Sequence, residues 1–238
     1  MRTGGRLRSV GAAGRRELTF LHPSLAARYV RAVAGVAPAI EAALSDAVAA
    51  SRVSAVSIDP PALRLRSFTL ERAAFRRRLT ALAARGGCLL FADVRDCFPS
   101  IDEGAVATAL RSFGCGQDPT DEVIGLLRRF GRLGVRGLPV GPEPSAVLAN
   151  AVLAAADHAL EASGLPHLRW VDDLVVALRR PADADPVLGR LRSSLGEVGL
   201  ALNEAKTRVV VGPGALAPRL SRGGTMRGAS AVGADAVG

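Results

Sequence analysis

Long uncharged apolar runs are missing from this sequence, although 49% of its 238 residues are hydrophobic. The most apolar helical stretches carry Glu41 and Asp46, or Asp157 and His158, so neither is typical of a membrane span. No apolar signal-peptide core follows the basic N-terminus, and we expect no export. Aromatic residues make up only 4%, and the apolar excess is mostly alanine. This composition favours a helix-rich soluble protein.

Cysteine and lysine are also scarce. The three cysteines, Cys88, Cys97 and Cys115, are odd in number and lack metal-ligand spacing, which indicates a reducing cytoplasm. Of 31 basic residues only Lys206 is a lysine. Lys can lose its proton whereas Arg effectively cannot, so a lone Lys suggests a chemical role, with chance survival as the alternative.

The charge is strongly positive, at +9 with a pI near 11.1. This favours an anionic partner, with nucleic acid the first candidate. An arginine bias from a GC-rich genome is the alternative source of the charge.

Hydrophobic spacing predicts the order of elements. We expect a helix through residues 21–36, a second helix that begins at Pro38 and reaches about Ala50, and a break at Pro60-Pro61. Further on, the pattern predicts a basic helix over 69–84, a strand over 88–94, helices over 102–113, 123–130 and 145–163, a hairpin over 167–178, a helix over 187–198 and a strand over 207–211. Residues 213–238 lack a periodic stripe and are expected to be a disordered tail.

From residue 88 onward this order is strand, helices, hairpin, helix, strand. It predicts an α+β fold of the split βαβ, ferredoxin-like type, a small antiparallel sheet with helices on one face.

The predicted hairpin carries Asp172 and Asp173 between two apolar runs. Such a pair is most often a solvated turn. It becomes a candidate metal site if Asp93, at the end of the strand over 88–94, lies beside it. Three oxygen-donor carboxylates at one sheet edge can bind two divalent ions, as in phosphoryl-transfer enzymes.

Four motifs in one order resemble the palm of bacterial reverse transcriptases of the group II intron and retron type. They are the run around Asp93, then Gly137-Leu138-Pro139-Val140-Gly141, Trp170-Val171-Asp172-Asp173 and Leu202-Asn203-Glu204-Ala205-Lys206-Thr207. The resemblance covers about residues 14–212. It implies a helical fingers-like region over 1–86, a palm over 87–212 and an RNA-directed DNA polymerase activity with two Mg²⁺ ions, Mn²⁺ being possible.

The resemblance also implies roles for single residues. Asp93, Asp172 and Asp173 would bind the metal ions, assisted by the backbone carbonyl of Val94, and Lys206 would protonate the departing pyrophosphate. Phe98 would obstruct a ribose 2′-hydroxyl; the alternative is an ordinary core residue, and one role does not exclude the other. Nucleotide contacts would come from Gly137, Gly141 and Arg16, although Arg16 also fits a flexible basic terminus. The implied partners are an RNA template, a DNA or RNA primer and dNTPs.

Some features depart from this family pattern. Trp170, Val140 and Ala146 stand where the family usually has Tyr, Gln and Pro, and only the predicted tail follows residue 212, where a thumb is expected. A protein partner could replace the thumb. Two alternatives therefore stay open: a non-catalytic palm that binds RNA or serves as a scaffold, and an untemplated or protein-primed polymerase of a phage-defence type.

Overall fold

The structure is a computed structural model that describes residues 4–11 and 14–212, with side chains from Leu18 onward. The predicted tail over 213–238 lies outside the described residues. Among the described residues, no helix combines the length and apolarity needed to cross a bilayer.

The centre of the molecule is a four-stranded antiparallel sheet with the order β6-β7-β5-β8. Its strands are β5 (Cys88–Asp93), β6 (His167–Trp170), β7 (Asp173–Leu178) and β8 (Arg208–Val211). Every residue of β5 is buried, because this strand is central and covered on both faces. The order confirms the predicted split βαβ arrangement and the α+β fold class.

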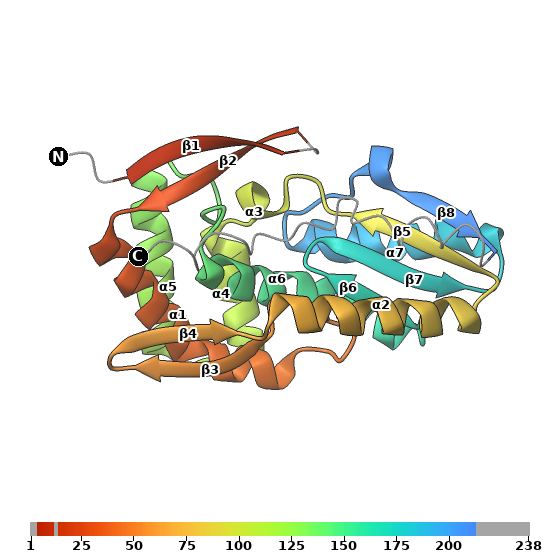
Figure 1. Cartoon of the computed structure of the whole chain (residues 1–238), viewed down its shortest axis with the longest axis horizontal. Helices are drawn as coiled ribbons and strands as arrows, with labels where there is room; N and C mark the ends of the chain where they lie inside the picture. The colour runs from red at the N-terminus through yellow and green to blue at the C-terminus, as the bar shows by residue number, and fades with distance from the viewer. Residues whose placement is uncertain (1–3, 12–13, 213–238) are drawn as a thin grey trace.

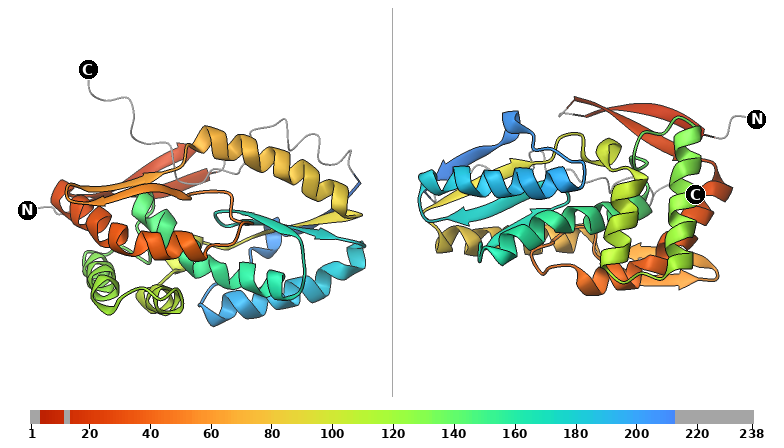
Figure 2. Two further views of the ribbon diagram at one scale, coloured as in Figure 1. Left: turned by 90° about the horizontal axis from the view of Figure 1, so that it is seen from below. Right: turned by 180° about the vertical axis from the view of Figure 1, so that it is seen from behind.

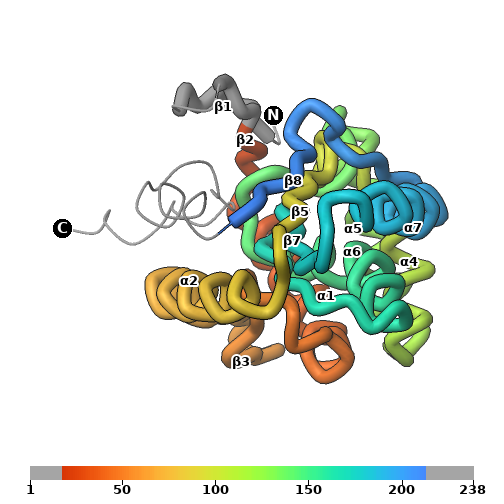
Figure 3. Tube along the Cα trace, turned by 90° about the vertical axis from the view of Figure 1, so that its right-hand side faces the viewer, coloured from red at the N-terminus to blue at the C-terminus, as the bar shows by residue number. Residues whose placement is uncertain are grey.

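Helices α6 (Glu143–Ala162) and α7 (Ala184–Glu197) cover one face of this sheet, as predicted. Successive strand residues point to opposite faces, so Leu90 and Val176 pack with these helices. The other face is partly covered by the basic helix α2 (Phe68–Arg85), whose Phe75 packs with Phe91 and Val175. Figures 2 and 3 show α2 and α7 on opposite sides of the strands.

The chain before the sheet is only partly helical (Figure 1). Besides α1 (Pro23–Ala43) and α2 it forms two hairpins, β1 (Gly4–Gly11) with β2 (Gly14–Leu21) and β3 (Val53–Ile58) with β4 (Pro61–Leu65). The predicted start of a new helix at Pro38 is wrong, because Pro38 lies inside α1. The buried residues Val33, Val36 and Ile40 keep one continuous face against the core across this proline.

Between β5 and β6 the chain forms α3 (Cys97–Ser100), α4 (Glu103–Ser112), α5 (Gln117–Arg132) and α6. The predicted N-cap of α4 is confirmed, since Asp102 accepts a hydrogen bond from the Ala105 amide over 2.8 Å. Two short 3₁₀ turns follow: η1 (Pro181–Asp183) comes before α7, and η2 (Glu204–Lys206) comes before β8.

Candidate functional site

Two of the predicted carboxylates face each other at one end of the sheet. Asp93 is the last residue of β5 and is paired in register with Asp173, the first residue of β7. Directly opposed strand residues project to the same face, here the face that α2 partly covers. Like charges in such a pair repel each other, so a neighbouring cation would stabilise the arrangement.

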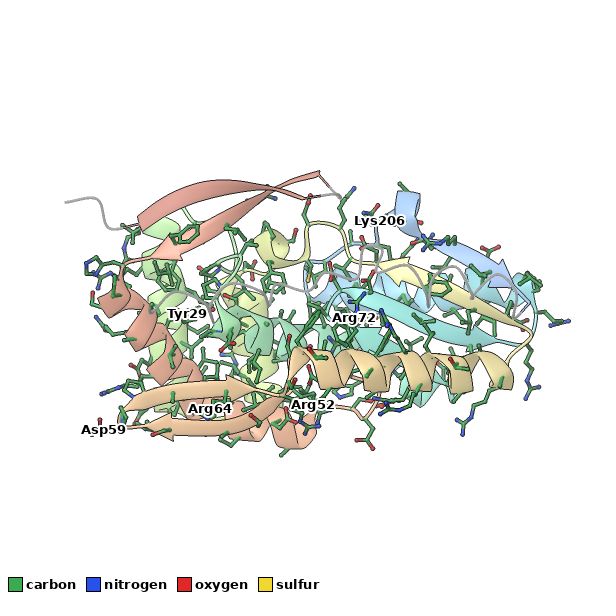
Figure 4. All side chains as sticks on the ribbon, in the orientation of Figure 1. Tyr29, Arg52, Asp59, Arg64, Arg72 and Lys206 are labelled. Atoms are coloured by element: carbon green, nitrogen blue, oxygen red, sulfur yellow. The ribbon has the colours of Figure 1, made fainter. Side chains whose placement is uncertain are left out.

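Lys206, the last residue of η2 (labelled in Figure 4), supplies a positive charge at this pair. Its Nζ donates to both carboxylate oxygens of Asp93, over 3.1 and 3.0 Å. The Lys206 side chain is 59% exposed whereas that of Asp93 is 10% exposed, so the ammonium reaches the carboxylate from the solvent side. The lone lysine of the chain thus contacts one of the three predicted aspartates.

Asn203 also binds Asp93, although it is not among the site residues predicted from the sequence. Its Nδ2 donates to Asp93 Oδ1 over 2.9 Å, and its amide donates to the Asp93 carbonyl over 2.7 Å. It belongs to the run Leu202–Thr207, three residues before Lys206, but that position alone does not show that it binds Asp93.

Asp172 is the second residue of the tight turn between β6 and β7. Its carbonyl accepts a hydrogen bond from the amide of Val94 over 3.2 Å, so the turn lies against the end of β5. Val171, the first residue of the turn, has φ 55°. A positive φ at this position is typical of a II′ turn, where glycine is usual and a β-branched residue is strained. The turn is therefore held in a conformation that its own sequence disfavours.

Cys97 lies near these carboxylates at the start of α3. Burial raises the pKa of its thiol strongly, the negative charge of Asp172 raises it further, and Arg169 lowers it. The thiol therefore stays protonated at neutral pH and is not available as a thiolate nucleophile or ligand.

The predicted nucleotide-binding segments meet at one place. Leu138 donates its amide to the Phe98 carbonyl over 2.9 Å, and Gly137 has φ +61°. A Cβ on Gly137 would lie 2.5 Å from that carbonyl oxygen, so this position requires glycine. The Phe98 side chain is half-buried and packs against the main core.

The same loop is joined to β2. The Thr19 amide donates to the Val140 carbonyl over 2.8 Å, and a Cβ on Gly141 would lie 3.8 Å from Leu18. Arg16 belongs to β2 opposite Ser9, but its side chain lies outside the described residues. Its predicted contact with a triphosphate therefore stays a prediction.

The donor chemistry of the site fits a divalent cation. Asp93 and Asp173 present hard oxygen donors on one face, with Asp172 next to them in the turn, and Asp93 already attracts the Lys206 ammonium. Among the residues that the structure describes, no group of three or more His, Cys, Asp or Glu side chains is arranged as a metal site. The assignment of Asp93, Asp172 and Asp173 as metal ligands stays a prediction.

The sheet order, with aspartates at the end of β5 and in the adjoining β6–β7 turn, is the arrangement expected for a polymerase palm. The model of the family described as reverse transcriptase (RNA-dependent DNA polymerase) matches residues 37–230, which is most of the chain. The chain therefore belongs to the reverse transcriptase family, as predicted.

Two solved structures are similar to this chain. Apo telomerase from Candida tropicalis, truncated from its C-terminal domain, is similar with a TM-score of 0.51 and 13% identity, over 89% of this chain and 51% of that one. Telomerase from Candida albicans in complex with a TWJ fragment of telomeric RNA gives a TM-score of 0.45 and 15% identity, over 80% of this chain and 34% of that one. The first likeness shows a shared fold, and this chain spans about half of that protein. No curated protein matches the chain.

Proposed function

We propose that this protein is an RNA-directed DNA polymerase of the bacterial group II intron and retron type. The observation that carries the proposal is the facing pair Asp93 and Asp173, with Asp172 in the adjoining turn and Lys206 on Asp93. A palm without catalytic activity would not need two opposed carboxylates and the single lysine of the chain at one sheet edge. Residues 1–86 would serve as fingers and residues 87–212 as the palm.

Asp93, Asp172 and Asp173 would hold two Mg²⁺ ions, or Mn²⁺, with the Val94 carbonyl assisting. Such a pair of ions lowers the pKa of a primer 3′-hydroxyl and neutralises charge on the departing pyrophosphate. Lys206, whose ammonium lies within 3.1 Å of Asp93, would protonate that leaving group.

The loop over 137–141 and the turn at Phe98 would shape the nucleotide pocket. Gly137 allows the loop backbone to lie directly against Phe98, and both are tied by the Leu138 hydrogen bond. This contact fixes the main chain at Phe98, whose ring would exclude a ribose 2′-hydroxyl. Arg16 on β2 would contact the triphosphate.

Primer extension with the full chain tests this function. An RNA template, a DNA primer and dNTPs with Mg²⁺ or Mn²⁺ should give products with the wild type and none with Asp172→Asn combined with Asp173→Asn. The matched control is Asp118→Asn combined with Asp121→Asn, which removes the same charge from the exposed side of α5.

The three functions predicted from the sequence give different results in this assay. Incorporation that continues without template would favour the untemplated or protein-primed alternative. RNA binding by the wild type with no incorporation above that of the double aspartate variant would reject the enzyme in favour of a scaffold palm.

A further inference from the structure

Arg169 is a fully buried charged residue on β6. Its Nε donates to both Asp157 oxygens over 3.0 and 2.9 Å, and its Nη2 donates to Asp157 Oδ2 over 2.7 Å, with both side chains 0% exposed. Burial alone would raise the pKa of Asp157, but the charge and hydrogen bonds of Arg169 and His167 lower it, so the pair is ionised. Buried ion pairs add little net stability because the loss of hydration offsets the attraction. A second contact of the guanidinium explains better why this charged side chain is buried here.

That second contact is to the turn of the candidate active site. Arg169 Nη1 donates to the Val171 carbonyl over 3.0 Å and to Asn150 Oδ1 over 2.8 Å. Val171 is the turn residue with φ 55°. Valine holds such a conformation only when its surroundings enforce it, and this hydrogen bond acts on the peptide group that joins Val171 to Asp172.

The groups that hold Arg169 are themselves fixed. Asn150 and Asp157 are two helical turns apart on α6 and so share one face of it. Asn150 Nδ2 donates to the Ala50 carbonyl over 2.9 Å, and the Arg169 amide donates to the Ala47 carbonyl over 2.9 Å. The guanidinium therefore connects the turn to α6, and the Arg169 amide and the Asn150 side chain connect both to the segment that follows α1.

We propose that Arg169 is a positioning residue: anchored by Asp157 and Asn150, it fixes the strained Val171–Asp172 turn and so places Asp172 beside the end of β5. Its effect on catalysis rests on the proposed function, whereas its effect on the turn does not. A displacement of about 1 Å at a reacting centre is enough to lower a rate by roughly 100-fold, so such an anchor matters.

Arg169→Lys is the informative substitution because an ammonium can keep the charge pair with Asp157 but cannot also reach Val171 and Asn150 in the same geometry. His167→Gln is the matched control. His167 lies on the same strand and contacts the same carboxylate, with Nε2 3.3 Å from Asp157 Oδ1, but its Nδ1 lies against the Leu165 carbonyl, on the side of the strand away from the turn.

The only tryptophan of the chain reports on the turn without any need for activity. Trp170 directly precedes Val171 and is 1% exposed. In the full chain, Arg169→Lys should raise the acrylamide quenching of Trp170 fluorescence well above the wild-type value, whereas His167→Gln should leave it near that value. If Arg169→Lys does not fold, Asn150→Ala, which retains the pair with Asp157, should show the same change to a smaller extent.

Kinetics separate positioning from simple stabilisation. In primer extension at a temperature where all variants are folded, Arg169→Lys should lower kcat by roughly 10- to 100-fold, the range for loss of a charged hydrogen bond, with little change in the KM for dNTP. Val171→Gly removes the strain that the anchor opposes. In that background Arg169→Lys should lower kcat by only about threefold or less.

Equal quenching and equal kcat in Arg169→Lys and His167→Gln would overturn the proposal, as would an unchanged effect of Arg169→Lys in the Val171→Gly background. If the wild type shows no incorporation, the proposed function fails and the quenching comparison alone decides whether Arg169 fixes the turn.

Discussion

Replacing Lys206 by methionine removes the ammonium that contacts both oxygens of Asp93 and leaves the fold almost untouched. Because the Lys206 side chain is 59% exposed, the ion pair contributes at most about 1 kcal/mol to the free energy of unfolding. A positioned general acid, in contrast, contributes about 10²–10⁴-fold to a rate. We therefore expect Lys206→Met to lower kcat by about 10²–10⁴-fold while the free energy of unfolding changes by less than about 1 kcal/mol.

Single-turnover primer extension and urea denaturation of the same preparations measure the two quantities. Lys206→Arg keeps the charge but cannot give up a proton, so it should be nearly as slow as Lys206→Met if proton donation is the role. Arg192→Met is the control, since it removes a cation from the neighbouring exposed pair with Glu204 without touching Asp93. A loss of less than about threefold in Lys206→Met, or a loss no larger than in Arg192→Met, would refute the reasoning.

Three further predictions concern stability. Asp102→Ala should lower the free energy of unfolding by about 1 kcal/mol in chemical denaturation, because it removes the N-cap of α4. Gly137→Ala should destabilise more than Gly164→Ala: both glycines have a positive φ, but only at Gly137 would the new Cβ meet the Phe98 carbonyl. The pKa of Asp157 is lowered in the folded state. Its stabilising contribution is therefore present at pH values above its ordinary pKa of 3.8 and is lost as the pH falls further. The difference in unfolding free energy between wild type and Asp157→Asn should shrink at this low pH.

Most of the sheet could be predicted from the sequence because its signals are local. The apolar run of β5, the hairpin over 167–178 and the N-cap at Asp102 each depend on a few adjacent residues. The order of these elements then restricts the topology, so the meeting of Asp93 with the hairpin could be expected before any coordinates.

The remaining features depend on contacts between distant segments. Local rules predict that a helix breaks at Pro38, but α1 continues through it because burial of Val36 and Ile40 outweighs the lost hydrogen bond. The anchor made by Arg169 joins residues from two elements, and nothing in the spacing of Asp157 identifies its partner. Asn203 could be found only once β8 and the turn before it lay beside β5.

The pairing of Asp93 with Asp173 makes the site a test of correct folding. The two residues are far apart in the sequence, and they share a face only in the observed register of β5 and β7. A slip of one residue would turn Asp173 to the opposite face of the sheet, toward α6 and α7, and would separate it from Asp93. A misregistered molecule would therefore lack the site altogether, so the specific activity of a preparation would measure the fraction of chains whose central strands are correctly paired.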